Sequence, residues 1–309
     1  MKKVFRNVFI LLFTSSLLAI FLQIFYQRLT EKIDPEQDWL QRQKVRKEAM
    51  NFTCLNKNLS SSKWRLKSEV ARQLFVVENY KLIYCEVPKV GCTNWKKILL
   101  LLTLNLSRDP SDINGDTIHY THLLKRLSSY PSEKQVELMN NYTKIIFIRH
   151  PLERLVSAYR DKFYHSEPYY ASIANRIKAL SRGGNNSTGQ VTFQEFVKFV
   201  LSEQIKYMDI HWKPMFMLCD PCNIHYNIVG KYETLEQDVK HVLRRIRAPD
   251  HLSYPDTKRI STDKRTNVNI TSTYFMELSW DKLWKIKELY RVDLSLFNYI
   301  FYLTNQTLP

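Results

Sequence analysis

Glycine, cysteine and acidic residues are scarce in this sequence, and each shortage excludes a class of protein. The 6 glycines do not form the G-x-x-x-x-G-K-[ST] loop with which Walker-type enzymes bind nucleoside triphosphates. The H-R-D and D-F-G motifs of protein kinases are also missing. With only 5 cysteines in 309 residues, the chain is not a small disulfide-stapled module.

Basic residues outnumber the acidic ones. Asp and Glu total 30 and Lys and Arg total 46, so the formal net charge is +16. Such a charge favours polyanionic partners, and nucleic acids, sulfated or uronic glycans and phosphorylated cofactors all qualify. Hydrophobic residues make up 44% and aromatic residues 13% of the chain, which is typical of a folded globular protein.

One long apolar run stands near the N-terminus, from Val8 to Tyr26, preceded by Lys2, Lys3 and Arg6. It is long enough to cross a bilayer and has no clear small-residue cleavage site, so it predicts an uncleaved signal anchor over residues 8–26. Basic residues favour the cytoplasmic side, which places residues 1–7 in the cytoplasm and the rest of the chain in the lumen. A cleaved signal peptide is the alternative.

Eight N-x-[ST] triplets support a lumenal location, because the composition would give roughly two or three by chance. The triplet at Asn186 overlaps that of its neighbour, and the two asparagines are not expected to carry glycans together. The predicted glycosylation sites are Asn51, Asn58, Asn105, Asn141, Asn185, Asn269 and Asn305.

The odd number of cysteines leaves at least one unpaired within the chain or paired with another chain. Cys219 and Cys222 are separated by two residues, a spacing that also occurs in redox motifs and in zinc sites. No second pair of ligands at zinc spacing and no thioredoxin-like context accompanies them. The pattern therefore predicts a local structural disulfide between Cys219 and Cys222.

The apolar pattern divides the remainder of the chain at about Leu74. Residues 27–73 are polar with charge runs, which indicates a stem, and residues 74–309 are predicted to form one folded domain. Strand-like runs end at Pro88 and lead into a helix-like segment over 95–104, and a strand over 144–149 leads into helical spacing from Pro151. Two strand–loop–helix units predict an α/β domain with a largely parallel sheet and flanking helices.

The loop between the first strand and its helix reads Pro88-Lys89-Val90-Gly91-Cys92-Thr93-Asn94. Backbone N–H groups at a helix N-terminus, a glycine that allows close approach, a lysine and a hydroxyl together favour binding of a phosphate or phosphosulfate. An ordinary turn capped by Thr93 or Asn94 is the alternative.

The second unit carries Arg149 at the strand end and Ser157 on the helix, away from the apolar face. Ligands of α/β sheets bind beyond the carboxyl ends of the strands, where an arginine fork and a hydroxyl can clamp a phosphate. A surface arginine paired with Glu153 is the alternative. Two such sites at successive strand ends favour one ligand with two anionic ends.

These two segments, PKVGCTNWKK and FIRHPLERLVSAYRDKF, resemble the cofactor motifs of Golgi carbohydrate sulfotransferases of the HNK-1 family. The resemblance implies a P-loop-like sulfotransferase fold, 3′-phosphoadenosine 5′-phosphosulfate as sulfuryl donor, and no metal. It also implies a Golgi membrane location and a glycan acceptor, which for the similar members is the 4-hydroxyl of N-acetylgalactosamine in chondroitin, dermatan or GalNAc-terminated glycans. Nucleic acid is not an expected partner of a lumenal protein.

The resemblance also assigns two sets of donor-binding residues. The first motif implies contacts with the 5′-phosphosulfate and consists of Pro88, Lys89, Val90, Gly91, Cys92, Thr93 and Asn94. The second implies contacts with the 3′-phosphate, chiefly by its first and last residues, and consists of Arg149, His150, Pro151, Leu152, Glu153, Arg154, Leu155, Val156 and Ser157.

Sulfuryl transfer resembles phosphoryl transfer, in which positioning and charge neutralisation supply most of the catalysis. We expect Lys89 to stabilise the leaving oxygen and a histidine to accept the proton of the acceptor hydroxyl. His119, between the two motifs, is the candidate base, and His211 and Glu86 are the alternatives. A non-catalytic glycosaminoglycan-binding glycoprotein that uses the basic cluster 244–247 is the competing function, but it leaves the two anion sites unexplained.

Overall fold

The computed structural model describes residues 34–115, 117–183, 188–255 and 265–302. The chain divides into two compact units, residues 1–42 and 43–309, and the fold described below is that of the second unit. The predicted membrane span from Val8 to Tyr26 lies outside the described residues. Of the helices within these ranges, none is both long enough and apolar enough to cross a bilayer.

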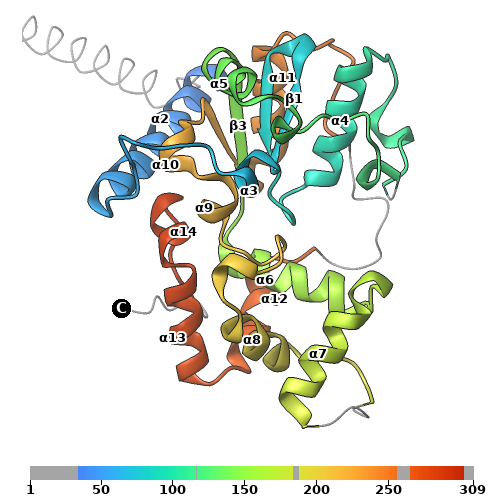
Figure 1. Ribbon diagram of the computed structural model, residues 1–309, viewed down its shortest axis with the longest axis vertical. Helices are drawn as coiled ribbons and strands as arrows, with labels where there is room; N and C mark the ends of the chain where they lie inside the picture. Colours follow the sequence, from blue (N-terminus) through green and yellow to red (C-terminus); the bar gives the residue numbers. More distant parts are fainter. Residues whose placement is uncertain (1–33, 116, 184–187, 256–264, 303–309) are drawn as a thin grey trace, which may run out of the picture. The chain divides into compact units, whose positions relative to one another are not determined.

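A mixed four-stranded sheet with the order β1-β2-β3-β4 forms the centre of the unit (Figure 1). β1 runs antiparallel to β2, whereas β2, β3 and β4 are parallel to one another. Nearly every strand residue is buried, so helices must cover both faces. The predicted α/β class is therefore confirmed, with three parallel strands and one antiparallel edge strand. The strands are β1 (Leu74–Val77), β2 (Leu82–Cys85), β3 (Thr143–Ile148) and β4 (Ile228–Lys231).

Each parallel strand leads into a helix. β2 is followed by α4 (Cys92–Leu104), β3 by α6 (Pro151–Tyr159), and β4 by α11 (Leu235–Arg245). Pro151 occupies the first turn of α6, where its missing N–H costs nothing, and the His150 ring caps that helix by accepting a hydrogen bond from the Leu152 N–H. The two predicted strand–loop–helix units are thus both present.

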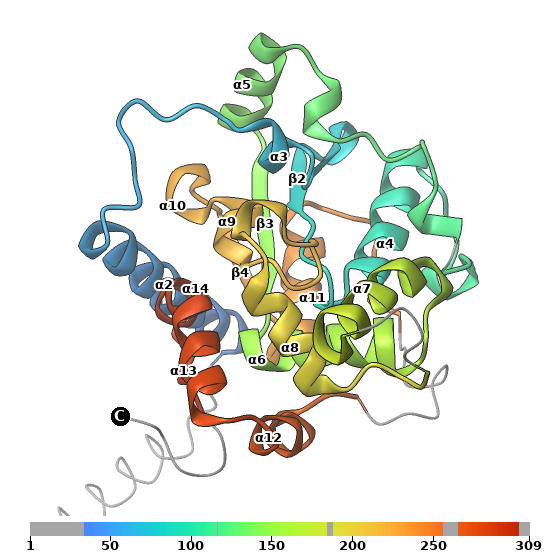
Figure 2. The same cartoon turned by 60° about the horizontal axis from the view of Figure 1, so that its bottom comes forward.

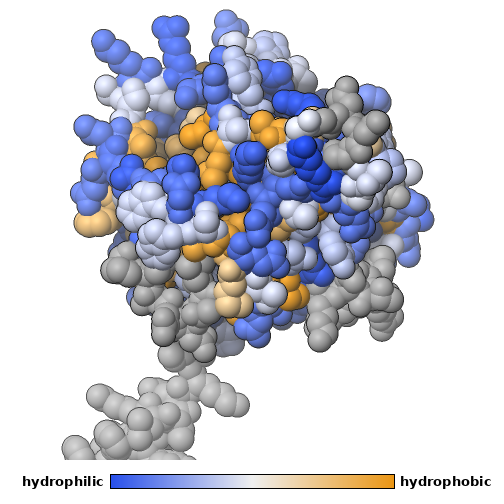
Figure 3. Space-filling model, turned by 90° about the horizontal axis from the view of Figure 1, so that it is seen from below, coloured by the Kyte–Doolittle hydropathy of each residue, from blue (hydrophilic) through white to orange (hydrophobic). Residues whose placement is uncertain are grey.

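A second group of helices gathers at the end of the sheet from which α6 leaves (Figure 1). Its core is rich in aromatic side chains, among them Tyr159, Phe196 and Trp212, and this packing fixes the direction of α6. Seen from this side, hydrophilic side chains dominate the surface, with hydrophobic ones between them (Figure 3). The helices of this group are α7 (Ala171–Arg182), α8 (Phe193–Ser202), α12 (Val268–Met276), α13 (Trp280–Leu289) and α14 (Arg291–Leu296).

One long helix, α2, and several short elements complete the described chain. The remaining α-helices are α2 (Pro35–Asn56), α3 (Ser68–Ala71), α5 (Ser132–Asn141), α9 (Met215–Cys219) and α10 (Pro221–Ile224). The 3₁₀ turns are η1 (Glu78–Tyr80), η2 (Pro110–Asp112), η3 (Thr117–His119), η4 (Leu127–Ser129), η6 (Pro168–Tyr170), η7 (Ile205–Tyr207) and η8 (Tyr232–Thr234). One π-helical turn, η5 (Arg160–Tyr164), continues α6.

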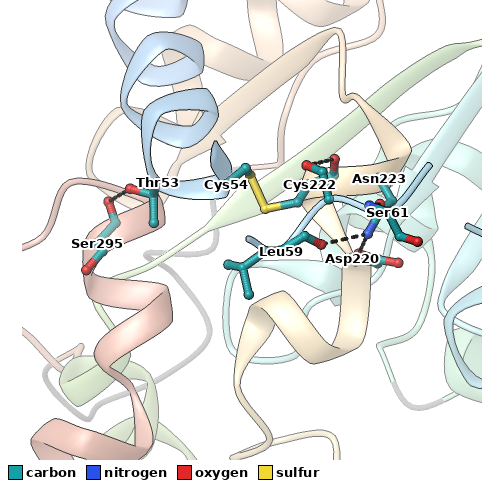
Figure 4. Close-up of a disulfide and its surroundings, with 9 residues drawn as sticks. Thr53, Cys54, Leu59, Ser61, Asp220, Cys222, Asn223 and Ser295 are labelled. Atoms are coloured by element: carbon teal, nitrogen blue, oxygen red, sulfur yellow. Dashed lines mark hydrogen bonds between the residues drawn. A yellow bond between two sulfur atoms is a disulfide. The ribbon is translucent and has the colours of Figure 1, made fainter. Parts of the chain in front are cut away.

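The disulfides correct one sequence prediction. The predicted local Cys219–Cys222 bond is wrong, because Cys219 pairs with Cys85 across 134 residues. Cys222 pairs with Cys54 across 168 residues, and Figure 4 shows this second disulfide. Cys219 is the last residue of α9 and Cys222 lies within α10, with a turn at Asp220 between the two helices. Cys219 therefore meets Cys85 of β2, and Cys222 meets Cys54 of α2. The fifth cysteine, Cys92, is free and buried, as the odd number requires.

The folded unit begins within the segment expected to form a stem. From Gln43 onward α2 belongs to the unit, and the Gln43 amide exchanges hydrogen bonds with the backbone of Val229 at 3.1 and 2.9 Å. Arg46 forms a buried ion pair with Asp238 at 2.8 Å. These contacts are polar, which is why an apolar pattern does not reveal them. Asn51 and Asn58 in this region, and Asn105, Asn141 and Asn269 elsewhere, are exposed, whereas Asn185 and Asn305 lie outside the described residues.

We predict that the Cys54–Cys222 disulfide contributes strongly to stability. Replacing both cysteines with serine should lower the free energy of unfolding by about 2–5 kcal/mol, since the bond closes a long loop in the unfolded chain. Chemical denaturation of the two proteins measures the difference. An unchanged unfolding midpoint would show that the bond merely accompanies the packing of α2.

Candidate functional site

A cavity of about 840 Å³ opens where β2 and β3 lead into α4 and α6. It combines four cationic side chains with two carboxylates and two histidines, so its interior suits a strongly anionic ligand. The turn η6, which leads into α7, contributes Tyr169 and Tyr170 to the lining, and in Figure 2 α4 and α7 both lie to the right of β3. Its lining is Lys89, Gly91, Cys92, Thr93, Asn94, Gly115, His119, Tyr120, Arg149, Ser157, Asp161, Lys162, Glu167, Tyr169, Tyr170, His211, Tyr232, Leu235, Tyr254 and Arg265.

The first anion loop turns sharply into α4. Lys89 and Gly91 both have positive φ, 70° and 78°, which directs the backbone toward the first turn of the helix. The positive φ of Gly91 favours glycine, and any side chain there would also have to displace the hydroxyl of Tyr254. The first N–H groups of a helix lack partners within it and attract anions. Pro88 and Val90 are buried and do not line the cavity.

Lys89 points to a carboxylate inside the cavity. Its ammonium lies 3.1 Å from Asp161, which also contacts Lys162 at 3.0 Å. Burial lowers the pKa of Lys89 and the Asp161 charge opposes this. Burial alone would raise the pKa of Asp161, but the two ammonium groups hold that pKa below its ordinary value. One carboxylate thus lies between two ammonium groups, so a net positive charge remains at this place in the cavity.

The second anion site centres on Arg149, which is only 2% exposed. Its terminal nitrogens donate to the carbonyls of Lys89 and Thr266, and its Nε lies 3.5 Å from the Glu153 carboxylate. Its guanidinium stacks on the Tyr232 ring at 4.1 Å. Each terminal nitrogen carries a second hydrogen, so the fork can hold the loop of Lys89 and still bind a phosphate.

Only the two ends of the second motif reach the cavity. Arg149 and Ser157 line it, as the helical spacing predicts, and the residues between them serve the fold. Glu153 and Arg154 form hydrogen bonds to other parts of the chain, and the remaining residues are buried. The residues of the motif that do not line the cavity are His150, Pro151, Leu152, Glu153, Arg154, Leu155 and Val156.

Arg154 ties two cavity walls together. Its buried guanidinium donates to the carbonyl of Pro88 at 3.0 Å and to the carbonyls of Lys213 and Ile210 at 2.8 and 2.5 Å. The first carbonyl belongs to the anion loop, and the other two belong to the segment that carries His211. A buried arginine with three carbonyl acceptors holds both segments in fixed positions.

The two candidate histidines both line the cavity, with different partners. At His119, Nδ1 lies 3.1 Å from the Lys96 ammonium and Nε2 lies 3.1 Å from the Thr93 hydroxyl. Because an ammonium can only donate, we assign the proton of the neutral ring to Nε2. Burial and then the Lys96 charge lower the pKa of His119. The Nε2–H of His119 therefore donates to the hydroxyl of Thr93, which itself lines the cavity.

His211 has the opposite arrangement. Its Nδ1 lies 2.7 Å from the Asp209 carboxylate and 2.9 Å from the Tyr170 hydroxyl, which itself bonds to Asp209 at 3.1 Å. Since a carboxylate accepts, Nδ1 carries the proton and Nε2 keeps a lone pair. Burial lowers the pKa of His211, although Asp209 opposes that shift. A neutral ring held in this tautomer can accept a proton.

Glu86, the third candidate base, does not line the cavity. Its carboxylate is buried and bonded to Lys96 at 2.5 Å and Arg126 at 2.8 Å. Burial would raise its pKa, but these two cations hold it below the ordinary value. Glu86 therefore positions Lys96, and through it the ring of His119.

Several cavity residues escape the sequence motifs. Asp161 and Lys162 follow the second motif by one helical turn, and the charged Arg-Asp-Lys run directly after Tyr159 is the signal that marks them. Tyr232 and Tyr254 bring aromatic rings from distant parts of the chain, and no local pattern distinguishes them from core residues. Within the described ranges, no group of three or more His, Cys, Asp or Glu side chains is arranged to hold a metal ion.

Fold and cavity together define an α/β protein in which the two candidate anion sites open on one cavity. The sequence matches the sulfotransferase family over residues 72–300. The chain belongs to this family, which confirms the resemblance predicted from the two motifs. No solved structure matches the chain significantly.

The curated relatives are named carbohydrate sulfotransferases. The chain is 39% identical to carbohydrate sulfotransferase 8 of Mus musculus over 267 residues, which cover 84% of this chain and 64% of the relative. It is 40% identical to carbohydrate sulfotransferase 9 of Homo sapiens over 236 residues, or 74% of this chain and 53% of the relative. It is 36% identical to carbohydrate sulfotransferase 11 of Rattus norvegicus, covering 82% and 75%. The chain thus spans less than two thirds of the first two of these relatives.

Proposed function

We propose that this protein transfers a sulfuryl group from 3′-phosphoadenosine 5′-phosphosulfate to a hydroxyl of a glycan. The carrying observation is that the two anion sites, taken from separate motifs, open on one cavity lined by both Lys89 and Arg149. A donor with a phosphosulfate at one end and a phosphate at the other matches that arrangement. Membership of the sulfotransferase family and the names of the relatives support the same reaction.

In this proposal the N-terminus of α4 and Lys89 hold the phosphosulfate, and Arg149 and Ser157 hold the 3′-phosphate. The rings of Tyr232 and Tyr254, both in the cavity lining, offer apolar faces for a purine base. The cavity volume of about 840 Å³ is in the range of sites for ligands of this size.

The donor supplies the sulfuryl group, and the chain's own residues neutralise charge and move a proton. The sulfur–oxygen bond to the donor phosphate breaks as a sulfur–oxygen bond to the acceptor hydroxyl forms. Lys89 and the α4 N–H groups stabilise the negative charge that grows on the leaving phosphate oxygen. We propose that His211 Nε2 accepts the hydroxyl proton and that the Nε2–H of His119 donates to an oxygen that gains charge. In this proposal the base is His211, the alternative named from the sequence, in place of His119.

For the acceptor we propose the 4-hydroxyl of N-acetylgalactosamine in chondroitin, dermatan or GalNAc-terminated glycans. We also propose that the protein is a type II protein of the Golgi membrane with its folded unit in the lumen. The exposed asparagines of the glycosylation triplets support lumenal placement. The full-length protein made in cells should migrate faster on a gel after glycosidase treatment. Unchanged migration would contradict lumenal placement.

The function is tested by incubating the full chain with sulfur-labelled donor and a panel of desulfated chondroitin, dermatan and neutral GalNAc-terminated acceptors. We expect label on at least one glycan, and digestion of the product locates the sulfated hydroxyl. If the protein still binds the desulfonated donor product but labels none of the glycans, the proposed reaction is overturned.

Arg149→Ala should weaken donor binding about ten- to a hundredfold, because it removes a charged hydrogen-bond donor worth about 1.5–3 kcal/mol. Calorimetric titration with 3′-phosphoadenosine 5′-phosphate measures this. Arg149 also holds the carbonyls of Lys89 and Thr266, so the variant's unfolding curve must be recorded beside that of the native protein. A stably folded Arg149→Ala protein with native affinity would remove Arg149 from the donor site.

A further inference from the structure

A second large hollow lies outside the donor cavity. It has a volume of about 630 Å³, and we name it the basic groove because six of its lining residues are cationic and two are acidic. The cationic residues are Lys63, Arg65, Lys67, Arg72, Lys206 and Lys213. The acidic ones, Glu69 and Asp220, do not balance them.

The charges of the groove are available to a ligand. Within the described part of the chain, none of the six cationic side chains forms an ion pair, and five of the six residues are exposed. Asp220 already accepts hydrogen bonds from the Trp64 indole at 2.6 Å and from the Asn223 amide at 2.7 Å. The sixth cationic residue of the groove, Lys213, is half-buried, and its ammonium donates to the carbonyl of Lys206 at 2.8 Å. Such a concentration of unpaired positive charge around a hollow favours a polyanion.

The groove also has apolar surfaces of the kind that sugar rings contact. Tyr207 is 69% exposed at its edge, and half-buried Phe216 and Met217 lie in its lining. Trp64 adds a second aromatic side chain, fixed by its bond to Asp220. Aromatic rings between cationic groups suit an acidic oligosaccharide, which alternates apolar ring faces with carboxylates or sulfates.

Its walls are held rigidly. Residues 59–61 bond to Cys222 and Asn223: Ser60 donates to the Cys222 carbonyl at 3.2 Å, and the Ser61 N–H donates to Asn223 at 3.0 Å (Figure 4). The neighbouring Cys54–Cys222 disulfide fixes the same corner. A preformed wall reduces the ordering cost of binding.

One segment connects the groove to the donor cavity. His211 lines the cavity, whereas Lys206 and Lys213, on either side of it in the chain, line the groove. Arg154 fixes this segment through the carbonyls of Ile210 and Lys213. If the acceptor hydroxyl of a glycan lies at His211, Lys206 and Lys213 lie near His211 in the sequence and can contact its neighbouring sugars.

We propose that the basic groove binds an acidic stretch of the acceptor glycan, carrying carboxylates or sulfates, next to the sugar that is sulfated. The inference rests on the proposed function and adds a place and a chemical class for acceptor recognition. It assigns the recognition of the acceptor's negative charge to the segment 63–72 and to Lys206 and Lys213, rather than to the basic cluster 244–247.

The test is the triple variant Lys63→Gln, Arg65→Gln and Lys67→Gln, which removes three exposed charges without touching the cavity. Its matched control removes three exposed charges from α11, Lys240→Gln, Arg244→Gln and Arg245→Gln. Exposed ion pairs contribute a factor of about 1.5 to 5 each, so the groove variant should raise KM for a uronate-containing N-acetylgalactosamine oligosaccharide about three- to a hundredfold. The α11 variant should leave KM unchanged, and neither should alter KM for a neutral GalNAc-terminated oligosaccharide.

A binding measurement separates this inference from the proposed reaction. Without donor, the full chain should bind the fluorescent uronate-containing oligosaccharide, the groove variant should bind it more weakly, and added salt should reduce the difference. Equal affinity of native chain and groove variant would overturn the groove, even if sulfate transfer is observed. Equal competition by an oligodeoxynucleotide of the same charge would show a general polyanion surface and would also overturn it. If no glycan is labelled yet the groove variant binds less, the reaction fails and the site stands.

Discussion

Replacing His211 by glutamine is expected to reduce turnover about a hundred- to ten-thousandfold, which is the usual contribution of a general base. The prediction follows from the tautomer set by Asp209, which leaves Nε2 free to accept a proton. Binding of 3′-phosphoadenosine 5′-phosphate should stay near native, because a base contacts the acceptor hydroxyl and not the nucleotide.

The pH profile distinguishes a base from a positioning group. His211 must be neutral to accept a proton, so kcat/KM of the native protein should fall as the pH drops through the pKa of His211 in the free enzyme. Burial lowers that pKa, which places the fall below about pH 6.5, the ordinary value for histidine. The residual activity of the glutamine variant should lack this fall.

His119→Gln is the matched variant, because it changes a second histidine of the same cavity. Its loss should be smaller, about ten- to a hundredfold, as expected for one hydrogen bond to a charged group. If His119→Gln instead causes the larger loss of turnover and its residual activity no longer falls at low pH, while His211→Gln keeps near-native turnover and the fall at low pH, His119 is the base. That result would mean that Lys96 leaves Nδ1 when the substrates bind.

Lys89→Ala is expected to lower kcat about a hundred- to a thousandfold, as does the loss of a group that stabilises charge in a transition state. The affinity for 3′-phosphoadenosine 5′-phosphate should change much less. Single-turnover rates with labelled donor, measured beside equilibrium binding, separate these two effects.

Lys162→Ala is the control for the loss of one positive charge from the cavity. Lys162 contacts the same oxygen of Asp161 at nearly the same distance as Lys89. We expect a smaller effect on kcat from this change, because Lys162 lies outside the loop that leads into α4. Equal losses in the two variants would show that the total positive charge matters rather than the position of Lys89.

Local patterns in the sequence predict those parts of the fold that depend on neighbouring residues. Buried strands such as Thr143–Ile148 and the start of α6 at Pro151 follow from apolar runs and proline geometry. The two anion sites follow as well, because a strand end, a turn and a helix start are consecutive in the chain. Ser157 is identified by helical spacing alone.

The remainder depends on contacts between distant residues. The spacing of Cys219 and Cys222 cannot show that each meets a cysteine more than a hundred residues away. The roles of the histidines depend on Lys96 and Asp209, whose positions relative to the rings are set by the tertiary fold. The docking of α2 through Gln43 rests on hydrogen bonds, to which hydropathy is blind.

The two disulfides impose an order on biosynthesis in any oxidising compartment. Cys54, Cys85 and Cys92 all leave the ribosome before either correct partner, Cys219 or Cys222, exists. At about 5–20 residues per second, the 219 − 92 = 127 residues of delay last roughly 6 to 25 seconds. Three thiols can therefore pair wrongly during translation, and any wrong bond must be undone by later exchange. Burial of Cys92, which raises its thiol pKa, removes it from such exchange once β2 and α4 have packed.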